Sequence, residues 1–379
     1  MGMQDPHKRS LQALAHRRRL RILQPRHGLD FSSNDYLGLA ESNFLRAASR
    51  AALERGVPLG AGGSRLLRGN HPEHEQLEAE ASEFFGGESA LFFGGGFAAN
   101  TALFATLPQR ADFIAFDALI HASVHDGMAM SRATHRPFAH NDPGSCDEAI
   151  AAWRREGGKG RAWIAIESLY SMDGDMAPLR DLAEVARRHD AMLVIDEAHA
   201  TGAIGPEGRG LAAELEGRNN VIALHTCGKA LGVSGAIITL PATQRDYMVN
   251  RARPFIYATA PSPLIAATVR AALKIIRDEP LRRLDLAARV AHAGNLLQTH
   301  CGIAPTGTHI QPVIVYRDET ALQLADQLQA AGFDVRAVRP PTVPEGTSRL
   351  RISLTLNVTD NDVTRLIETL APLLREATQ

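Results

Sequence analysis

Short apolar runs alternate with amphipathic segments through the middle of the chain. The apolar runs predict strands at residues 89–93, 112–117, 161–167, 191–196 and 221–224. The amphipathic segments between them predict helices at residues 97–107, 121–130, 145–155 and 179–189. Strands that alternate with helices favour an α/β fold, in which helices cover both faces of a mostly parallel sheet.

The two ends of the chain depart from this pattern. Residues 10–23 predict an amphipathic helix rich in arginine, and a strand that runs into a turn follows at residues 29–39. Residues 262–300 are mostly helical in pattern. After them we expect mixed strands and helices at residues 311–316, 320–331, 333–338 and 349–354, and a last helix from Asp360. This pattern predicts a smaller C-terminal α+β domain.

Pro280 interrupts a long helical pattern and marks a domain boundary. We therefore predict an N-terminal helix and strand segment at residues 1–45, a large domain at residues 46–278, and a small C-terminal domain at residues 279–379.

Composition narrows the classes of function. The 379 residues are 45% apolar, which supports a sizeable core. A formal net charge of −1 gives no bulk attraction to nucleic acid or to an anionic membrane, and we find no apolar run that could span a bilayer. Three scattered cysteines argue against a disulfide framework and fit a cytoplasmic protein. The basic start lacks the apolar core of a secretory signal, whereas a transit peptide remains open.

Two histidines, His71 and His74, lie beside Glu73 and Glu75 and raise the question of a metal site. Their spacing is not that of a helical zinc motif. A helix that starts here with acidic residues in its first turn explains the cluster equally well, and we expect no metal.

Charged side chains follow two successive predicted strands. Asp196 ends one strand, His199 lies three residues further on, and Lys229 follows the next strand. Because ligands bind outside the carboxyl ends of parallel strands, we expect an acid, an imidazole and an amine around one cleft.

The stretch GGGFAA at residues 94–99 lies between a predicted strand and a predicted helix, and fits G-x-G-x-x-A. Asp117 follows about twenty residues later, as in dinucleotide-binding sites, so an NAD-binding oxidoreductase remains open. The motif itself indicates only that backbone N–H groups at a helix start face an anion, and a single phosphate satisfies it. The DEAH sequence at residues 196–199 also occurs in nucleoside triphosphatases, but the chain has no G-x-x-x-x-G-K-[ST] loop.

Pyridoxal 5′-phosphate is a cofactor that needs all of these groups. It requires a phosphate site, an anion beside its protonated ring nitrogen, and a lysine that forms an imine. The glycine-rich helix start, Asp196 and Lys229 supply them, and the small residues Cys227, Gly228 and Ala230 leave room for a ring.

Six motifs are spread along the chain: FSSNDYLGL (31–39), GGFAAN (95–100), YSMDGD (170–175), DEAH (196–199), TCGKALGVSG (226–235) and RPPTVP (339–344). Together they make the chain resemble the α-oxoamine synthases, a branch of the fold type I pyridoxal-phosphate enzymes related to aspartate aminotransferase. The resemblance covers nearly the whole chain. It implies a large cofactor-binding domain with a mostly parallel sheet and a smaller C-terminal α+β domain.

The resemblance also assigns roles to residues. Lys229 would bind the cofactor covalently and move the α-proton of the substrate, and Asp196 would pair with the ring nitrogen. His121 would stack on the ring and help in catalysis beside the substrate. The other cofactor contacts would come from Gly96, Phe97, Ser171, His199, Thr226 and, from the neighbouring subunit of a homodimer, Thr259. Substrate contacts would come from Arg21, Thr342 and Arg339 or Arg351.

Within the family, the chain most resembles the members that condense L-alanine with a pimeloyl thioester in biotin biosynthesis. The acyl group would arrive on coenzyme A or on an acyl carrier protein. A sister synthase, or a glycine C-acetyltransferase, that uses glycine or serine and another acyl thioester remains the alternative.

Overall fold

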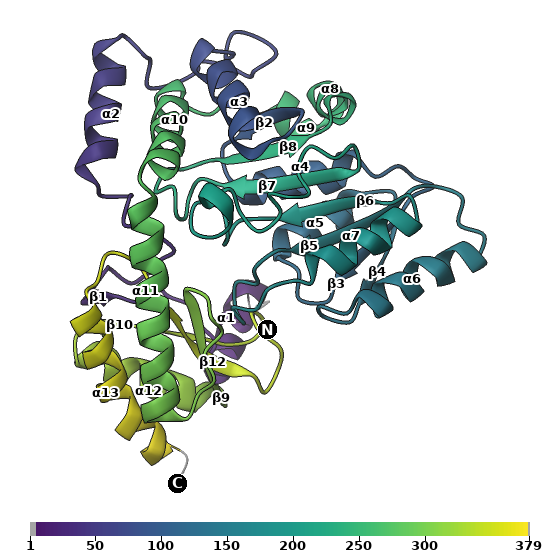
Figure 1. The fold of residues 1–379 in the computed structure, drawn as a ribbon. Coiled ribbons are helices and arrows are strands. Elements are labelled where there is room, and N and C mark those ends of the chain that lie inside the picture. Colours follow the sequence, from purple (N-terminus) through teal and green to yellow (C-terminus); the bar gives the residue numbers. More distant parts are fainter. Residues whose placement is uncertain (1–4, 378–379) are drawn as a thin grey trace. The chain divides into compact units, whose positions relative to one another are not determined.

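The structure of the chain, a computed structural model, describes residues 5–377 (Figure 1). Its contacts define two compact units. The large unit comprises Asn34–Tyr170 and Asp175–Leu284, and the small unit comprises Met1–Ser33, Ser171–Gly174 and Asp285–Gln379. The division into residues 1–45, 46–278 and 279–379 stays a prediction.

A seven-stranded sheet forms the centre of the large unit, with the strand order β2-β8-β7-β6-β5-β3-β4. The strands are β2 (Ser89–Phe93), β3 (Phe113–Asp117), β4 (Thr134–Phe138), β5 (Ala162–Glu167), β6 (Met192–Asp196), β7 (Val221–Thr226) and β8 (Ala236–Leu240). Only β8 runs antiparallel to its neighbours β2 and β7, and the other pairs are parallel. The mostly parallel sheet predicted from the sequence is therefore confirmed.

Helices cover both faces of this sheet. Successive side chains of a buried strand point to opposite faces, so an apolar strand makes both faces apolar and both need a cover. In β5, Trp163 and Ala165 join one apolar cluster, whereas Ile164 and Ile166 join another. The first cluster lies under α4 (Gly96–Thr106) and α5 (Ala122–Met130), and the second under α6 (Pro143–Arg155) and α7 (Leu179–Arg188). The remaining helices of this unit are α2 (Asn43–Glu54), α3 (Pro72–Phe85), α8 (Ala242–Arg251), α9 (Arg253–Ile256), α10 (Pro263–Asp278) and the 3₁₀ turn η1 (Pro206–Gly208).

The small unit contains an antiparallel sheet with the order β11-β12-β9 and a short parallel pair of β1 and β10. These strands are β1 (Leu29–Asp30), β9 (Ile310–Tyr316), β10 (Phe333–Asp334), β11 (Arg336–Val338) and β12 (Ser348–Ser353). Its helices are α1 (Pro6–His16), most of α11 (Pro280–Leu296, which belongs to the large unit up to Leu284), α12 (Asp318–Ala330), α13 (Asp360–Ala377) and the π-helical turn η2 (Leu297–Cys301). One apolar cluster, which includes Phe31, Leu350 and Leu366, joins the N-terminal segment to this C-terminal part.

Some predicted elements were wrong in extent. The N-terminal helix spans Pro6–His16 and not residues 10–23, because the backbone turns to a left-handed conformation at Arg18 (φ +55°). The strand predicted at residues 333–338 is two short strands, β10 and β11. The helix expected after the histidine and glutamate cluster is α3, in which Pro72 occupies the first turn, where a missing N–H costs nothing, and His71 caps the helix.

No helix among residues 5–377 is long and apolar enough to cross a membrane.

Candidate functional site

Asp196, His199 and Lys229 come together in the large unit, beyond the carboxyl ends of β6 and β7. These strands are parallel neighbours, and Asp196 pairs in register with Leu224. The chain continues from β6 to His199 and from β7 to Lys229. His199 Nε2 lies 2.7 Å from Lys229 Nζ, and Asp196 and His199 are both buried. The structure thus brings this imidazole and this amine into contact at one edge of the sheet.

Asp196 is held by two hydrogen-bond donors. Asn100 Nδ2 donates to Oδ2 at 2.7 Å, and the backbone N–H of Ala198 donates to Oδ1 at 2.9 Å. Asn100 lies in α4 and also donates to Ser123 Oγ of α5 at 3.0 Å. These two donors fix the position of the Asp196 carboxylate. The roles of Asn100 and Ser123 were not predicted from the sequence.

His121 caps the N-terminus of α5. Its Nδ1 accepts a hydrogen bond from the backbone N–H of Ser123 at 3.2 Å and lies 2.8 Å from Ser123 Oγ. Its ring meets Phe97 edge to face, with centroids 6.3 Å apart. The pKa of His121 is lowered, chiefly by desolvation and also by the charge of Lys229, whereas Asp196 opposes the shift. The ring is therefore neutral at pH 7 and can accept a proton.

The helix α4 starts with an anion-binding arrangement. Its N-cap is Gly95, and no side chain caps the first turn, which begins with Gly96 and Phe97. Thr226 lies beside this turn, because a Cβ built on Gly96 would be 3.5 Å from Thr226 Oγ1. A Cβ on Gly94 or Gly95 would meet nothing within 4 Å, so the approach to the helix start is open.

These residues fit pyridoxal phosphate. Backbone N–H groups at an uncapped helix start suit a phosphate. A buried carboxylate with two donors suits a protonated ring nitrogen, and the Lys229 amine suits an aldehyde. Lys229, Asp196, His199, His121, Gly96, Phe97 and Thr226 are the predicted cofactor residues that the large unit brings to this place.

Behind His199 lies Tyr36, another residue whose role the sequence analysis missed. Its Oη is 2.6 Å from His199 Nδ1 and donates to Asn34 Oδ1 at 3.0 Å. Tyr36 is completely buried. Tyr36 and Asn34 both lie in the FSSNDYLGL motif, and this motif is the sequence signal that could have pointed to their role.

Thr259 is exposed and lies next to Ala260, whose backbone N–H donates to Gly63 O at 2.8 Å. This bond ties the segment of Thr259 to the glycine-rich loop that precedes α3.

A second group of predicted residues lies in the small unit. Arg21 donates to Thr342 Oγ1 at 2.9 Å. The pKa of Arg339 is lowered, chiefly by burial; the charge of Asp318 opposes this shift, and the charges of Arg21 and Arg19 add to it. Arg21, Thr342 and Arg339 therefore share one basic region.

Ser171 belongs to the short segment Ser171–Gly174, which packs on the small unit. Arg351 Nε donates to Ser171 O at 2.6 Å, and Arg349 contacts Met172 O and Asp173. Arg351 thus holds the backbone of the loop that carries Ser171.

Asp117, the acidic residue of the dinucleotide alternative, is engaged within the fold. It is fully buried, and its carboxylate lies 2.8 Å from His140 Nδ1 and accepts from the backbone N–H groups of Leu119 and Asn141. Although burial alone would raise it, these hydrogen bonds hold the pKa of Asp117 below its usual value. The carboxylate that the NAD alternative required is therefore already engaged in hydrogen bonds within the protein.

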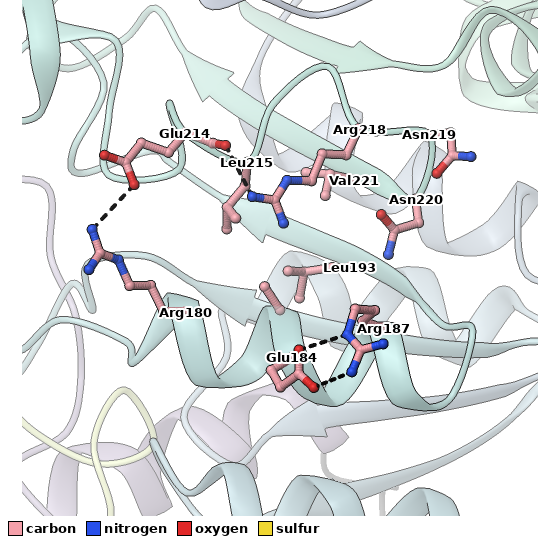
Figure 2. A pocket seen from close by; sticks show the side chains of 11 residues that line it. Arg180, Glu184, Arg187, Leu193, Glu214, Leu215, Arg218, Asn219, Asn220 and Val221 are labelled. Carbon is pink, nitrogen blue, oxygen red and sulfur yellow. Dashed lines mark hydrogen bonds and ion pairs between the residues drawn. The ribbon is translucent and has the colours of Figure 1, made fainter.

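A surface pocket elsewhere in the large unit contains none of the predicted residues. Figure 2 shows it between α7 and the segment before β7, where Arg180 pairs with Glu214 and Arg187 with Glu184. Paired charges of this kind need no ligand. Among residues 5–377, no group of three or more His, Cys, Asp or Glu side chains is arranged to hold a metal ion.

Comparisons with known proteins agree with this site. A family model of class I and II aminotransferases matches residues 26–370. The chain is 40% identical to the 8-amino-7-oxononanoate synthase of Herminiimonas arsenicoxydans over 350 residues, which are 90% of this chain and 89% of that one. Among solved structures, Sphingomonas wittichii serine palmitoyltransferase is similar with a TM-score of 0.85 and 28% identity, over 92% of this chain and 87% of that chain.

The solved 8-amino-7-oxononanoate synthase of Francisella tularensis is also similar, with a TM-score of 0.77 and 26% identity, over 93% of this chain and 99% of that chain. These likenesses confirm the predicted fold type I architecture. The chain belongs to the class I and II aminotransferase family and, within it, to the 8-amino-7-oxononanoate synthases.

Proposed function

We propose that this protein is a pyridoxal-phosphate-dependent acyltransferase that condenses L-alanine with a pimeloyl thioester. The products are 8-amino-7-oxononanoate, carbon dioxide and the free thiol, and the reaction would serve biotin biosynthesis. The observation that carries the proposal is the arrangement of Asp196, His199 and Lys229 beside the open start of α4. A relative named 8-amino-7-oxononanoate synthase is 40% identical over nine tenths of the chain, which supports the choice of reaction.

When bound, pyridoxal phosphate supplies an electron sink for the pair of electrons left by removal of the alanine α-proton. The backbone at Gly96 and Phe97, together with Thr226, would hold its phosphate. Asp196, which accepts hydrogen bonds from Asn100 and from the backbone of Ala198, would pair with its protonated ring nitrogen. His199 and Ser171 would contact its phenolic oxygen.

Lys229 would attach the cofactor through Nζ and, once displaced by alanine, would take the α-proton at the same atom. His199, 2.7 Å away, limits where this amine can lie. Positioning a base against one carbon–hydrogen bond is a large part of such catalysis.

His121 would lie on the ring face and orient the alanine carboxylate or assist proton transfer. Its lowered pKa fits this role, because a neutral imidazole can accept a proton at pH 7. The contacts with Ser123 fix its ring, so little side-chain entropy is lost when substrate binds.

The pimeloyl chain carries a carboxylate at its far end. Arg21 and Arg339 would bind this carboxylate, and Thr342 would help to place it through its contact with Arg21. A short acyl group without a carboxylate would not use these residues, so they would set the preference for the acyl donor.

The active form would be a homodimer in which Thr259 of one subunit reaches the cofactor phosphate of the other. The exposure of Thr259 leaves it available for such a contact.

The test is a matrix of substrates with the purified, cofactor-loaded protein. L-alanine, glycine and L-serine are each combined with pimeloyl-CoA, pimeloyl carrier protein, acetyl-CoA and palmitoyl-CoA, and thiol and carbon dioxide are measured. We expect turnover with alanine and a pimeloyl donor, and no turnover in Lys229→Ala. Turnover only with glycine and a short acyl group, or only with serine and palmitoyl-CoA, would replace the proposed reaction by that of a sister enzyme.

A pair of variants tests the acyl specificity. Arg21→Ala should raise KM for the pimeloyl donor by about tenfold or more and leave KM for alanine unchanged, because a lost charged hydrogen bond costs about 1.5–3 kcal/mol. Arg26→Ala, an exposed arginine five residues away, is the control and should leave both values unchanged.

A further inference from the structure

His74 links the start of helix α3 to the segment that carries Thr259. It is completely buried, and both of its ring nitrogens have backbone partners. Nδ1 accepts from the N–H of His71 at 3.2 Å, and Nε2 lies 2.8 Å from the oxygen of Pro261. Pro261 follows Thr259 by two residues, in the connection between α9 and α10. One of the two histidines that raised the question of a metal site is thus used inside the fold.

The partners of His74 define which nitrogen carries its hydrogen. A backbone N–H can only donate and a backbone oxygen can only accept, so Nδ1 is the acceptor and Nε2 the donor. Burial is the main cause that lowers the pKa of His74, which agrees with a neutral ring. His74 is therefore a neutral bridge that donates from α3 to the Pro261 oxygen.

The same helix also holds the glycine-rich loop that contacts this segment. Glu78 lies one turn after His74 and on the same side of α3. Its two carboxylate oxygens accept from Arg65 Nη1 and Nη2 at 2.8 and 2.9 Å, and the two side chains are only 8% and 9% exposed. Arg65 lies two residues after Gly63, whose backbone oxygen accepts from the N–H of Ala260 at 2.8 Å. One side of α3 thus holds both neighbours of the segment.

Two hydrogen bonds therefore fix the backbone directly after Thr259. The N–H of Ala260 is bonded to the glycine-rich loop, and the oxygen of Pro261 to His74. Residues 257–262 belong to no helix or strand, so no regular element sets the position of this backbone. Ala260 is buried and Thr259 is exposed. The buried side of the segment is held from within the large unit, and Thr259 is left at the surface.

We propose that His74 is a positioning residue that holds the Pro261 oxygen and thereby places Thr259 for contact with the cofactor phosphate of the neighbouring subunit. The inference rests on the proposed function, because it presumes the homodimer and the phosphate contact of Thr259. It adds a residue that acts on the site of the other subunit through Thr259 and needs no contact with cofactor or substrate.

Two substitutions separate the functions of the two ring nitrogens. The amide nitrogen of glutamine reaches about as far as Nε2 and can donate to the Pro261 oxygen, whereas the amide oxygen of asparagine replaces only Nδ1 as the acceptor for His71 N–H. The Kd for pyridoxal phosphate is measured by absorbance titration. It should rise about threefold to tenfold in His74→Asn, as for one lost hydrogen bond, and stay close to the wild-type value in His74→Gln. An unchanged Kd in His74→Asn, or a larger loss in His74→Gln, would overturn the proposal and leave His74 a helix cap.

Pyridoxal, which lacks the phosphate, is the second probe. Because the proposed contact is with the phosphate, the Kd for pyridoxal should be the same in the wild-type protein, His74→Asn and Thr259→Ala. An equal loss of affinity for both probes in His74→Asn would indicate a general disturbance of the fold and would overturn the proposal. In Thr259→Ala, the Kd for pyridoxal phosphate should rise, and adding His74→Asn should raise it no further, because both substitutions remove one contact. Additive losses would contradict this shared route.

His71→Asn is the matched control. His71 belongs to the same cluster, but its ring accepts from the N–H of Glu73 to cap α3, and asparagine is also a good cap. This variant should leave the Kd for both probes unchanged.

If His74→Asn does not fold, Arg65→Lys gives a second test of the same frame. Lysine keeps a positive charge beside Glu78 but cannot form the two parallel bonds that hold the loop of Gly63. It should raise the Kd for pyridoxal phosphate and not that for pyridoxal. An unchanged Kd for pyridoxal phosphate in Arg65→Lys would count against the proposal.

These titrations involve no amino acid and no acyl thioester. A failed condensation assay together with the expected Kd changes would remove the proposed reaction and keep the role of His74. Turnover with an unchanged Kd in His74→Asn would do the reverse. An unchanged Kd in Thr259→Ala would remove the contact between subunits and this inference with it.

Discussion

At the scale of single residues, Asn100 holds the carboxylate of Asp196 in place. Its amide donates to Asp196 Oδ2 at 2.7 Å and to Ser123 Oγ at 3.0 Å, and it is almost fully buried. We predict that Asn100→Ala lowers kcat/KM for L-alanine about tenfold to a hundredfold, because a hydrogen bond to a charged group contributes about 1.5–3 kcal/mol. Steady-state kinetics and a titration of the pyridoxal phosphate affinity measure the loss.

The control for Asn100 is Asn250→Ala, which removes an amide that donates to Asp246 O on the exposed helix α8. It should leave both measurements unchanged. If Asn100→Ala keeps the wild-type kcat/KM, then the backbone N–H of Ala198 suffices to hold Asp196, and the amide is a packing element.

The same residues show what the sequence can and cannot predict about the site. Asp196, His199 and Lys229 follow apolar strands, so their meeting at one sheet edge follows from local pattern and from the topology of parallel sheets. The partners Asn100 and Tyr36 could not be assigned in this way. Asn100 lies 96 residues from Asp196 in the sequence, and Tyr36 lies 163 residues from His199. Only the packing of the elements brings each residue to its partner.

At the scale of elements, the packing of α4 against α5 sets the spacing between Phe97 and His121. Gly127 of α5 lies where the two helices cross. A Cβ there would come within 2.8 Å of Phe104 Cβ and within 3.2 Å of Asn100 O. The close approach of the helices therefore requires glycine at this position.

We predict that Gly127→Ala destabilises the protein by about 1–3 kcal/mol, the usual cost of overpacking, although alanine is the better helix former. Urea denaturation measures the change in the free energy of unfolding. Ala129→Gly, two residues away on the exposed side of α5, is the matched comparison and should cost about 1 kcal/mol through helix propensity alone. A stabilised Gly127→Ala would mean that α4 and α5 can separate without loss.

Elements were predictable where burial imposed a pattern. The buried strands β3, β5 and β6 were found within a residue of their bounds, because both of their faces are covered and their sequences are continuously apolar. The edge strand β4 was missed, because four of its five residues are exposed and Pro137 interrupts the strand pattern. The strand β8 was missed although its run from Ala236 to Leu240 is mostly apolar, because the run is short and directly follows a glycine-rich stretch, which predicts a turn.

At the scale of the whole molecule, the free energy of unfolding depends on pH through a half-buried histidine. His140 lies 2.8 Å from a carboxylate oxygen of Asp117 and 2.8 Å from one of Asp175. Desolvation alone would lower its pKa, but the two carboxylates raise the pKa of His140 to about 10. The unfolded chain releases this proton near pH 6.5. The folded state thus binds more protons than the unfolded state between these values, and stability from His140 is complete below pH 6.5 and is lost as the pH rises toward 10.

We therefore predict that His140→Gln destabilises the protein by about 1–3 kcal/mol at pH 7 and by progressively less as the pH approaches 10. Urea denaturation at pH 7, 8.5 and 10 measures this difference, and groups common to both proteins cancel. His7→Gln is the control, because His7 also lies beside a carboxylate, Asp5, but with its side chain 91% exposed, against 26% for His140. Solvent screens such an exposed pair, so this substitution should change stability at none of the three pH values. A destabilisation in His140→Gln that is equal at pH 7 and pH 10 would show that His140 contributes through packing and not through its charge.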